Sequence, residues 1–281
     1  MIRKFKDYKI TENKALKIGL ALGSGGARGI AHIEFLKIFD ELGIKPHMIT
    51  GCSMGSLIGG LYASGASAVD IEKYFSSLSL RDIQKLTDIV MHKSGFIKGD
   101  KAVAEMKKRI KSKTFKSLKI PLKVVATDFY DGDEYVFSKG DLFKAIRASC
   151  SIPGVFIPVK YKNKLLVDGG IVNPVPYDLL MKNCDYIIAI DVAEGTFSKT
   201  RKEHKKKQIN PSVHEIIYST YEIVQLNIIN SMIKINPPHL FIKPPVSNFN
   251  MMEFHRGKEI LELAKPDAKK FKSILKKIIN N

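Results

Sequence analysis

Short apolar runs alternate along the chain with longer segments in which apolar residues recur at helical spacing. The apolar runs have the length of buried β-strands, and they predict strands at 17–22, 48–50, 122–127, 134–137, 165–168, 186–191 and 239–242. The segments between them predict helices at 30–42, 54–63, 68–77, 80–92, 100–113, 141–148, 213–233, 254–265 and 267–279. This alternation is typical of an α/β fold with parallel strands.

Three other segments bear on the domain organisation. Residues 94–99 interrupt the pattern, and residues 197–208 are so rich in lysine that we expect a mobile polar loop there. Core packing explains the helix at 213–233 better than membrane insertion does. Because no repeat or boundary is visible, we expect one domain over 1–281, with a C-terminal helical extension over about 210–281.

One predicted strand ends in a G-x-S-x-G turn that leads directly into a helix, Gly51-Cys52-Ser53-Met54-Gly55. The flanking glycines permit the cramped backbone that pushes the Ser53 hydroxyl out above the sheet. The hydroxyl also lies at a helix N-terminus, where free amides and the helix dipole favour the negative charge of acyl transfer. Ser53 is therefore the candidate nucleophile.

A glycine-rich turn follows the first predicted strand, Gly23-Ser24-Gly25-Gly26-Ala27-Arg28-Gly29. Its amides can surround an anion. A dinucleotide site would need glycine at position 28 and an acidic residue after the next strand, and a Walker loop would need Gly-Lys-Ser/Thr. An oxyanion hole is the better interpretation, because neighbouring parallel strands end at the same edge and bring residues 25–27 beside Ser53. A plain strand-to-helix turn is the remaining alternative.

A carboxylate ends the predicted strand at 165–168 and precedes two glycines, Asp168-Gly169-Gly170. As a turn residue, Asp168 would need no chemistry. A carboxylate held rigidly at a strand end can also act as the base for Ser53. The hydroxyls of Ser149 and Ser151 compete for the nucleophile role, but neither has a glycine-flanked turn.

None of the seven histidines has the place in the sequence that a Ser-His-Asp triad requires. His32 falls one turn into the first helix, and we expect it to form a hydrogen bond beneath the glycine-rich turn. The other histidines fall at the wrong end of the sheet or on polar surfaces. Asp168 is therefore preferred as the direct base.

The charge is strongly basic, with 46 Lys and Arg against 28 Asp and Glu and a net charge of +18. A lysine-rich solvated surface explains this most simply, and peripheral contact with an anionic membrane surface stays open. No zinc cluster, aromatic RNA-binding motif or basic recognition helix supports a nucleic-acid partner. Asp128 and Asp131 lack the spacing of a calcium loop, so we expect no metal.

Three features of the sequence bear on the cellular compartment. The charged N-terminus lacks the apolar core of a signal peptide, and no apolar run reaches the roughly 18 residues of a membrane span. The three cysteines are few and odd in number, which suits a reducing compartment. We expect a cytoplasmic protein without a transmembrane segment.

Three of these blocks occur together in one order: Gly25-Gly26-Ala27-Arg28-Gly29, Gly51-Cys52-Ser53-Met54-Gly55 and Asp168-Gly169-Gly170. In that order they resemble the signature blocks of the patatin-like phospholipase family. The similarity extends to His32, residues 146–158 and Asn173-Pro174-Val175-Pro176, and so spans about 16–195.

The resemblance implies a three-layer α/β/α fold with a mostly parallel sheet and extra C-terminal helices. It also implies a catalytic dyad of Ser53 and Asp168, an oxyanion hole formed by the amides of residues 25–28, and no metal or cofactor. The implied reaction is hydrolysis of phospholipids, lysophospholipids or other fatty acyl esters through an acyl-serine. Arg28 would brace the loop or meet a lipid phosphate. A non-catalytic lipid-binding or regulatory protein on the same fold is the alternative.

Overall fold

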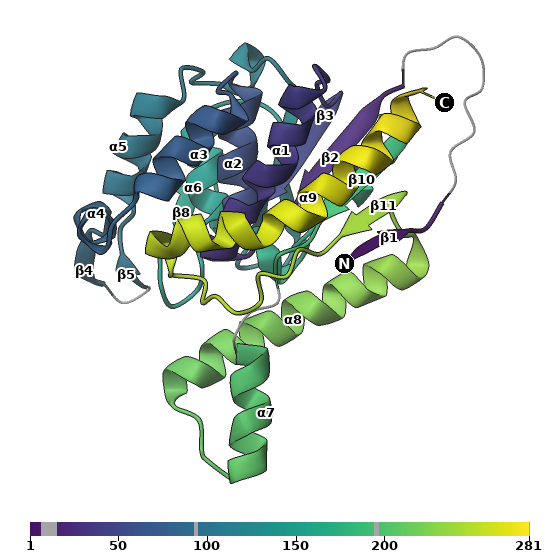
Figure 1. Ribbon diagram of the computed structural model, residues 1–281. Helices are drawn as coiled ribbons and strands as arrows, with labels where there is room; N and C mark the ends of the chain where they lie inside the picture. Colours follow the sequence, from purple (N-terminus) through teal and green to yellow (C-terminus); the bar gives the residue numbers. More distant parts are fainter. Residues whose placement is uncertain (7–15, 93–94, 194–196, 281) are drawn as a thin grey trace.

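The computed structural model describes residues 1–6, 16–92, 95–193 and 197–280. At its centre lies a nine-stranded sheet in the order β1-β11-β10-β2-β3-β6-β9-β8, with β7 also paired to β6 (Figure 1). The strands are β1 (Ile2–Lys4), β2 (Ile18–Leu22), β3 (Met48–Cys52), β6 (Leu122–Asp128), β7 (Glu134–Phe137), β8 (Val159–Tyr161), β9 (Lys164–Asp168), β10 (Tyr186–Ile190) and β11 (Leu240–Ile242). The five central strands β11, β10, β2, β3 and β6 are parallel, and β1, β7, β8 and β9 join antiparallel.

Helices cover both faces of this sheet, as expected for a three-layer fold. They are α1 (His32–Glu41), α2 (Met54–Ala63), α3 (Ala68–Ser77), α4 (Leu80–Leu86), α5 (Asp100–Arg109), α6 (Leu142–Ser149), α7 (Phe197–Lys207), α8 (Val213–Ile235) and α9 (Gly257–Asn280). Short 3-10 turns are η1 (Gly26–Ala31), η2 (Phe115–Ser117), η3 (Gly169–Ile171), η4 (Asp178–Leu180) and η5 (Phe254–Arg256). A separate two-stranded sheet pairs β4 (Ile89–His92) with β5 (Gly95–Ile97).

Alternation of side chains along the central strands divides the core in two. Leu20 and Leu22 on β2 face a large cluster formed with α1, α2, α3, α6 and α9, whereas Ala21 between them faces a smaller cluster that includes Ile229 of α8. The predicted mixed α/β fold with a mostly parallel sheet and C-terminal helices is therefore confirmed.

Three predicted elements differ from the structure in kind or number, and the helix expected at 100–113 is shorter, ending at Arg109. The helix expected at 80–92 is the short helix α4 followed by β4. The chain turns there because Asp88 accepts hydrogen bonds from the amides of Gly99, Asp100 and Lys101, at 2.6, 2.7 and 3.2 Å, and so caps the start of α5. Residue 94, in the expected break at 94–99, lies outside the described residues, and residues 95–97 form β5.

The second difference is the loop expected at 197–208, of which Phe197–Lys207 forms helix α7. Its end is fixed to the following chain, because the Ile209 amide donates to the His204 carbonyl at 3.0 Å and the His204 ring lies 3.7 Å from Glu215 of α8. A local sequence pattern does not predict this tertiary support.

The third difference is the C-terminus, where one helix, α9, replaces the two that were expected. Pro266 lies inside it and removes one backbone hydrogen bond. The helix continues because its apolar face packs on α1, where the ring of Phe271 lies 5.8 Å from Phe35 and 5.9 Å from Phe39. Strands β1 and β8 were not predicted, since each is short and defined only by its pairing with a neighbour.

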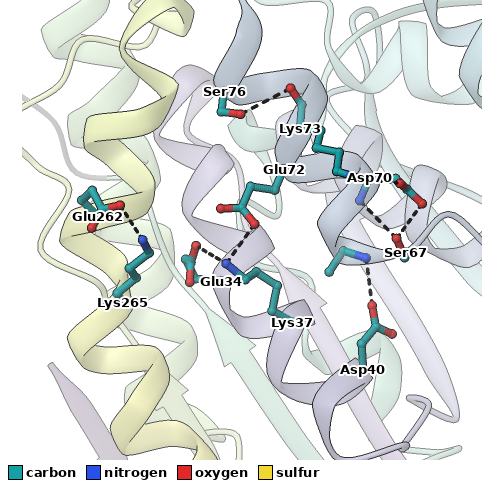
Figure 2. A network of polar contacts seen from close by, with 11 residues as sticks. Glu34, Lys37, Asp40, Ser67, Asp70, Glu72, Lys73, Ser76, Glu262 and Lys265 are labelled. Atoms are coloured by element: carbon teal, nitrogen blue, oxygen red, sulfur yellow. Dashed lines mark hydrogen bonds and ion pairs between the residues drawn. The ribbon is translucent and has the colours of Figure 1, made fainter.

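Polar contacts join the helices of the larger layer to one another (Figure 2). Lys37 on α1 binds Glu34 at 3.0 Å and reaches Glu72 on α3 at 2.9 Å. Asp40 of α1 accepts a hydrogen bond at 2.8 Å from the amide of Ala68, the first residue of α3. These bonds fix α3, one wall of the cavity described below, relative to α1.

Within the described ranges, no helix has both the length and the apolar character needed to cross a membrane.

Candidate functional site

The turn that carries Ser53 joins β3 to α2 in a strained conformation. Ser53 has φ 51° and ψ −121°, a region that residues other than glycine rarely occupy. Its amide donates to the hydroxyl of Ser149 at 2.8 Å, which holds the turn in place. Gly55 must lack a side chain, because a Cβ there would lie 2.1 Å from the carbonyl oxygen of Leu22 on β2. The structure therefore has the sharp turn that the sequence predicted, and it lies against the start of the glycine-rich turn, since the same Cβ would lie 2.7 Å from the Gly23 carbonyl oxygen.

The two competing serines have structural partners. The Ser149 hydroxyl accepts from the Ser53 amide, as above. The Ser151 hydroxyl accepts from Arg147 Nη1 at 2.7 Å and donates to the Arg147 carbonyl at 2.9 Å. The Ser149 hydroxyl thus ties the end of α6 to the Ser53 turn, and the Ser151 hydroxyl holds the chain after α6 against that helix.

Asp168 ends β9 at the same level of the sheet as the Ser53 turn. The register pairs Asp168 with Ala126 on β6, and Cys52 pairs with Val125 on that same strand. The Asp168 amide donates to the Ser151 carbonyl at 2.9 Å, and the Asp168 carbonyl accepts a hydrogen bond from the Thr127 hydroxyl at 2.8 Å. The backbone of the carboxylate is therefore fixed on both sides.

The two oxygens of the Asp168 carboxylate have unequal environments. Oδ1 accepts from the Gly170 amide at 2.8 Å and from the Tyr221 hydroxyl at 2.9 Å, and the Cys52 thiol lies 3.9 Å away. Oδ2 is buried with no hydrogen-bond partner in the described part of the chain. Oδ1 is thus held in place, and Oδ2 is left available to accept a proton.

Burial raises the pKa of Asp168 to about 6, because a buried carboxylate is poorly solvated in its charged form. Among the groups that oppose this shift and lower the pKa, the side chain of Ser53 has the largest effect. The two side chains therefore lie close enough to interact, although the Ser53 hydroxyl is not aligned in a hydrogen bond to Oδ2.

Tyr221 was not found from the sequence. It lies on α8, outside the segment of similarity, and the nearby side chain of Gln225 follows it one turn later. In the sequence it is one residue within the helix predicted at 213–233, a position that predicts packing and not a bond to Asp168.

The glycine-rich turn forms η1 and its N-cap. Gly26 has φ 59°, and a Cβ there would lie 2.3 Å from the Met251 carbonyl oxygen. The Ala27 amide donates to that same carbonyl at 2.8 Å. Within the described residues, the amides of Gly25 and Gly26 have no acceptor. Of the amides predicted to bind an oxyanion, these two are therefore free of any described acceptor, whereas the Ala27 amide is engaged.

Arg28 is fully buried, and its guanidinium is bound on all sides. Nε donates to the Val192 carbonyl at 3.0 Å, and Nη2 donates to the Ala193 carbonyl at 2.7 Å. Nη1 donates at 3.2 Å to both the Phe249 carbonyl and Glu222 of α8. The side chain therefore braces the loop, and it is not placed to meet a lipid phosphate.

An apolar cavity of about 190 Å³ opens beside Ser53 and Gly26. Its walls come from α2 to α6 and from the segment before α9, and include Leu57, Leu61, Tyr74, Phe75, Ile83, Leu86, Met106, Ile146, Met251, Met252 and Phe254. The charged residues in its lining are paired: Arg109 binds Glu105 at 2.8 Å, and Arg147 Nη2 donates to the Ile157 carbonyl at 2.8 Å. The cavity therefore suits a hydrocarbon chain.

Other candidate groups at this site do not have the properties of a nucleophile or a base. Burial raises the pKa of the Cys150 thiol to about 12, and that of Cys52 is raised well above its usual range, so both thiols are protonated at neutral pH. Burial lowers the pKa of His32 to about 4, and its Nε2 lies 2.9 Å from the Gly23 carbonyl, which is the hydrogen bond that was expected.

Among the side chains that the structure describes, no histidine lines the cavity or binds Asp168. The side chains of His92 and His214 lie outside that set. The described residues also contain no cluster of three or more His, Cys, Asp or Glu that could hold a metal ion.

Comparison with known proteins finds relatives over most of the chain. An uncharacterized NTE family protein of Mycobacterium tuberculosis is 35% identical over 185 residues, which cover 66% of this chain and 51% of that protein. The lysophospholipase NTE1 of Saccharomyces cerevisiae is 29% identical over 263 residues, covering 86% of this chain and 16% of that protein. A patatin-like phospholipase domain-containing protein of Caenorhabditis elegans is 30% identical over 270 residues, which cover 88% of this chain and 20% of that protein. The chain thus spans about half the length of the mycobacterial relative and a smaller share of the others.

A solved structure and a family model complete the comparison. VipD from Legionella pneumophila superposes with a TM-score of 0.49 at 15% identity, covering 69% of this chain and 53% of that chain. The model described as patatin-like phospholipase matches residues 20–181, more than half of the sequence. The chain therefore belongs to the patatin-like phospholipase family.

Proposed function

We propose that this protein is a serine hydrolase that releases fatty acids from lipid acyl esters, with Ser53 as nucleophile and Asp168 as base. One observation carries the proposal: Asp168 Oδ2 is buried without a partner among the described residues, its carboxylate interacts with the side chain of Ser53 in a strained turn, and Ser53 lines an apolar cavity. Family membership and the lysophospholipase name of the yeast relative support the same class of reaction.

In the first half of the reaction, Asp168 Oδ2 takes the proton of the Ser53 hydroxyl while Oγ bonds to the ester carbonyl carbon. The carbonyl oxygen becomes an oxyanion and accepts hydrogen bonds from the free amides of Gly25 and Gly26. The amide of Ala27 joins them once it leaves the Met251 carbonyl. The amide of Arg28 lies in the 3-10 turn that its own side chain braces.

Collapse of this intermediate breaks the bond to the alcohol, which leaves with the proton from Asp168. The acyl group remains on Ser53. A water molecule then gives a proton to Asp168 and attacks the acyl carbon, and Ser53 recovers its proton as the fatty acid is released. Burial aids both halves, because a carboxylate with a pKa of about 6 is a better base than one in water and is still ionised at neutral pH.

Tyr221 acts as a positioning residue in this mechanism. By donating to Oδ1 together with the Gly170 amide, its hydroxyl holds that oxygen in place and leaves Oδ2 to act as the base. Because Tyr221 lies on α8, the C-terminal helical extension and the signature region form one functional unit in this proposal.

The substrate carries a hydrocarbon chain that enters the apolar cavity, as a phospholipid, a lysophospholipid or another fatty acyl ester would. The net charge of +18 favours encounter with such lipids at an anionic membrane surface.

The nucleophile can be tested by labelling with a fluorophosphonate. The wild-type chain and Ser151→Ala should be labelled, and mass spectrometry should place the label on Ser53. Ser53→Ala should not be labelled, and both Ser53→Ala and Asp168→Asn should lose ester hydrolysis while keeping wild-type circular dichroism.

A panel of phospholipids, lysophospholipids and neutral acyl esters, with products identified by mass spectrometry, then defines the substrate. Binding of lipid without labelling or product would support a non-catalytic lipid-binding protein. Near-normal hydrolysis by Asp168→Asn would require another base.

A further inference from the structure

Helix α8 has an exposed face that is apolar along its first half. The exposed residues recur at helical spacing, with Val213 74%, Ile216 50%, Ile217 49% and Ile223 41% exposed. Ile209, just before the helix, is 49% exposed. Farther along the same face Asn227, Asn230 and Lys234 are exposed, and a single exposed apolar residue, Ile235 at 84%, ends the helix well away from the first group. The apolar part is therefore a localised patch. We call Ile209, Val213, Ile216, Ile217 and Ile223 the docking face.

A cluster of lysines lies next to the docking face. Lys202, Lys205, Lys206 and Lys207 are exposed on α7, which packs beside the start of α8. The nearby acidic residues offset this charge little: Glu203 is a single exposed carboxylate, and Glu215 is bonded to Ser212 as part of a capping box. In Figure 1, α7 and the first turns of α8 project away from the helical layers at the bottom of the view. Apolar side chains beside lysines are typical of helices that lie in a membrane interface.

The opposite face of α8 meets the wall of the cavity. Tyr218 of α8 packs in one cluster with Ile152 and Met251, and Phe156 packs against that cluster. These last three residues also line the cavity. The hairpin of β4 and β5 adjoins the same wall through the bridge between Ile97 and Phe156, and its Phe96 is 64% exposed. The docking face thus lies on the outer side of a helix whose inner side reaches the proposed acyl site.

We propose that the docking face binds the surface of an anionic phospholipid bilayer, with its apolar side chains inserted among the head groups and the lysines of α7 at the level of the phosphates. Charge complementarity selects this partner, because exposed isoleucines alone would also suit a protein, whereas the adjacent lysines favour a dense anionic surface. The role in catalysis rests on the proposed function: docking would place the cavity beside the lipids from which the substrate is drawn. Binding itself does not depend on hydrolysis.

The test measures sedimentation with vesicles, using the full chain carrying Ser53→Ala so that lipid composition stays constant. Phosphatidylcholine vesicles with phosphatidylglycerol should bind the protein, and pure phosphatidylcholine vesicles should bind it at least about tenfold more weakly. In that background Ile216→Glu with Ile217→Glu should lower binding to the anionic vesicles by about tenfold or more. The matched control is Asn227→Glu with Asn230→Glu, which adds the same charge on the polar part of the same face and should change binding less than about threefold.

Replacing Lys205, Lys206 and Lys207 with Gln should reduce the preference for anionic vesicles and leave the weak binding to neutral vesicles unchanged. All of these positions are exposed, so the variants should keep the wild-type circular dichroism and melting temperature. The proposal is overturned if the isoleucine variant and the asparagine variant bind anionic vesicles equally well.

The proposal is also overturned if the wild-type chain ignores vesicles but forms a dimer, seen by analytical ultracentrifugation, that Ile216→Glu with Ile217→Glu dissociates. The docking face would then join two copies of the chain. Hydrolysis of a soluble short-chain ester, measured with Ser53 intact, separates this from the proposed function. Normal hydrolysis without vesicle binding refutes only the docking face, and vesicle binding without hydrolysis refutes only the enzyme.

Discussion

Removing the hydroxyl of Tyr221 should shift the pH dependence of hydrolysis upward. In the proposed reaction Asp168 must be ionised, so the rate of acylation should rise with pH through its pKa of about 6. The Tyr221 hydroxyl donates to Oδ1 at 2.9 Å and stabilises the charged form. Tyr221→Phe deletes this donor and keeps the ring that packs beside Ile152 and Met251.

The magnitude follows from the strength of one bond to a charged group. Such a bond contributes about 1.5–3 kcal/mol, or about one to two pKa units at 1.36 kcal/mol per unit. The Gly170 amide still donates to the same oxygen, so we expect the lower end, a rise of about one unit. On the acidic limb of the profile the rate should then fall about tenfold, and the plateau at high pH should fall less.

The assay is kcat/KM for a soluble acyl ester, measured across the pH range in which the wild-type chain stays folded. Tyr218→Phe is the matched control, because it removes another buried phenol hydroxyl one turn earlier on α8 and should leave the inflection in place. If Tyr221→Phe lowers the rate equally at every pH, the hydroxyl does not tune Asp168 and this reasoning is wrong.

Three further predictions concern stability and specificity. Burial raises the folded-state pKa of Asp168 from 3.8 to about 6, so the folded protein holds this proton more tightly than the unfolded chain does. The resulting contribution of Asp168 to the free energy of unfolding is fully present below about pH 4 and is lost as pH rises through 6. Asp168→Asn should remove this loss and raise the free energy of unfolding near pH 8 by up to about 3 kcal/mol, as measured by urea denaturation at several pH values. Arg28→Met should lower the free energy of unfolding by about 3–5 kcal/mol, because Glu222 would be left buried without its cation; unchanged urea midpoints would contradict the brace. Met106→Trp should narrow the cavity and shift hydrolysis toward shorter acyl chains, as compared across a series of ester chain lengths, and an unchanged preference would place the acyl chain elsewhere.

The sequence by itself determined the local elements on which the candidate site is built. The turn around Ser53 was predictable because its glycines are required by the backbone itself: Gly55 lies against the Leu22 carbonyl, and no other residue fits there. Helices at 54–63 and 68–77 have the predicted bounds, since their apolar spacing and end signals are local. The neighbouring position of the glycine-rich turn followed from the rule that parallel strands end at one edge.

Tertiary structure alone decided how these elements meet. Strand β9 runs antiparallel to β6 and so brings Asp168 to the level of Cys52, an outcome of sheet order that no local pattern encodes. Three bonds at the site join residues far apart in the sequence. Tyr221 and Asp168 are 53 positions apart, Ser149 and Ser53 are 96 apart, and Ala27 and Met251 are 224 apart. Such contacts depend on packing free energy summed over the whole core, whereas turns and helix ends depend on the few residues that form them.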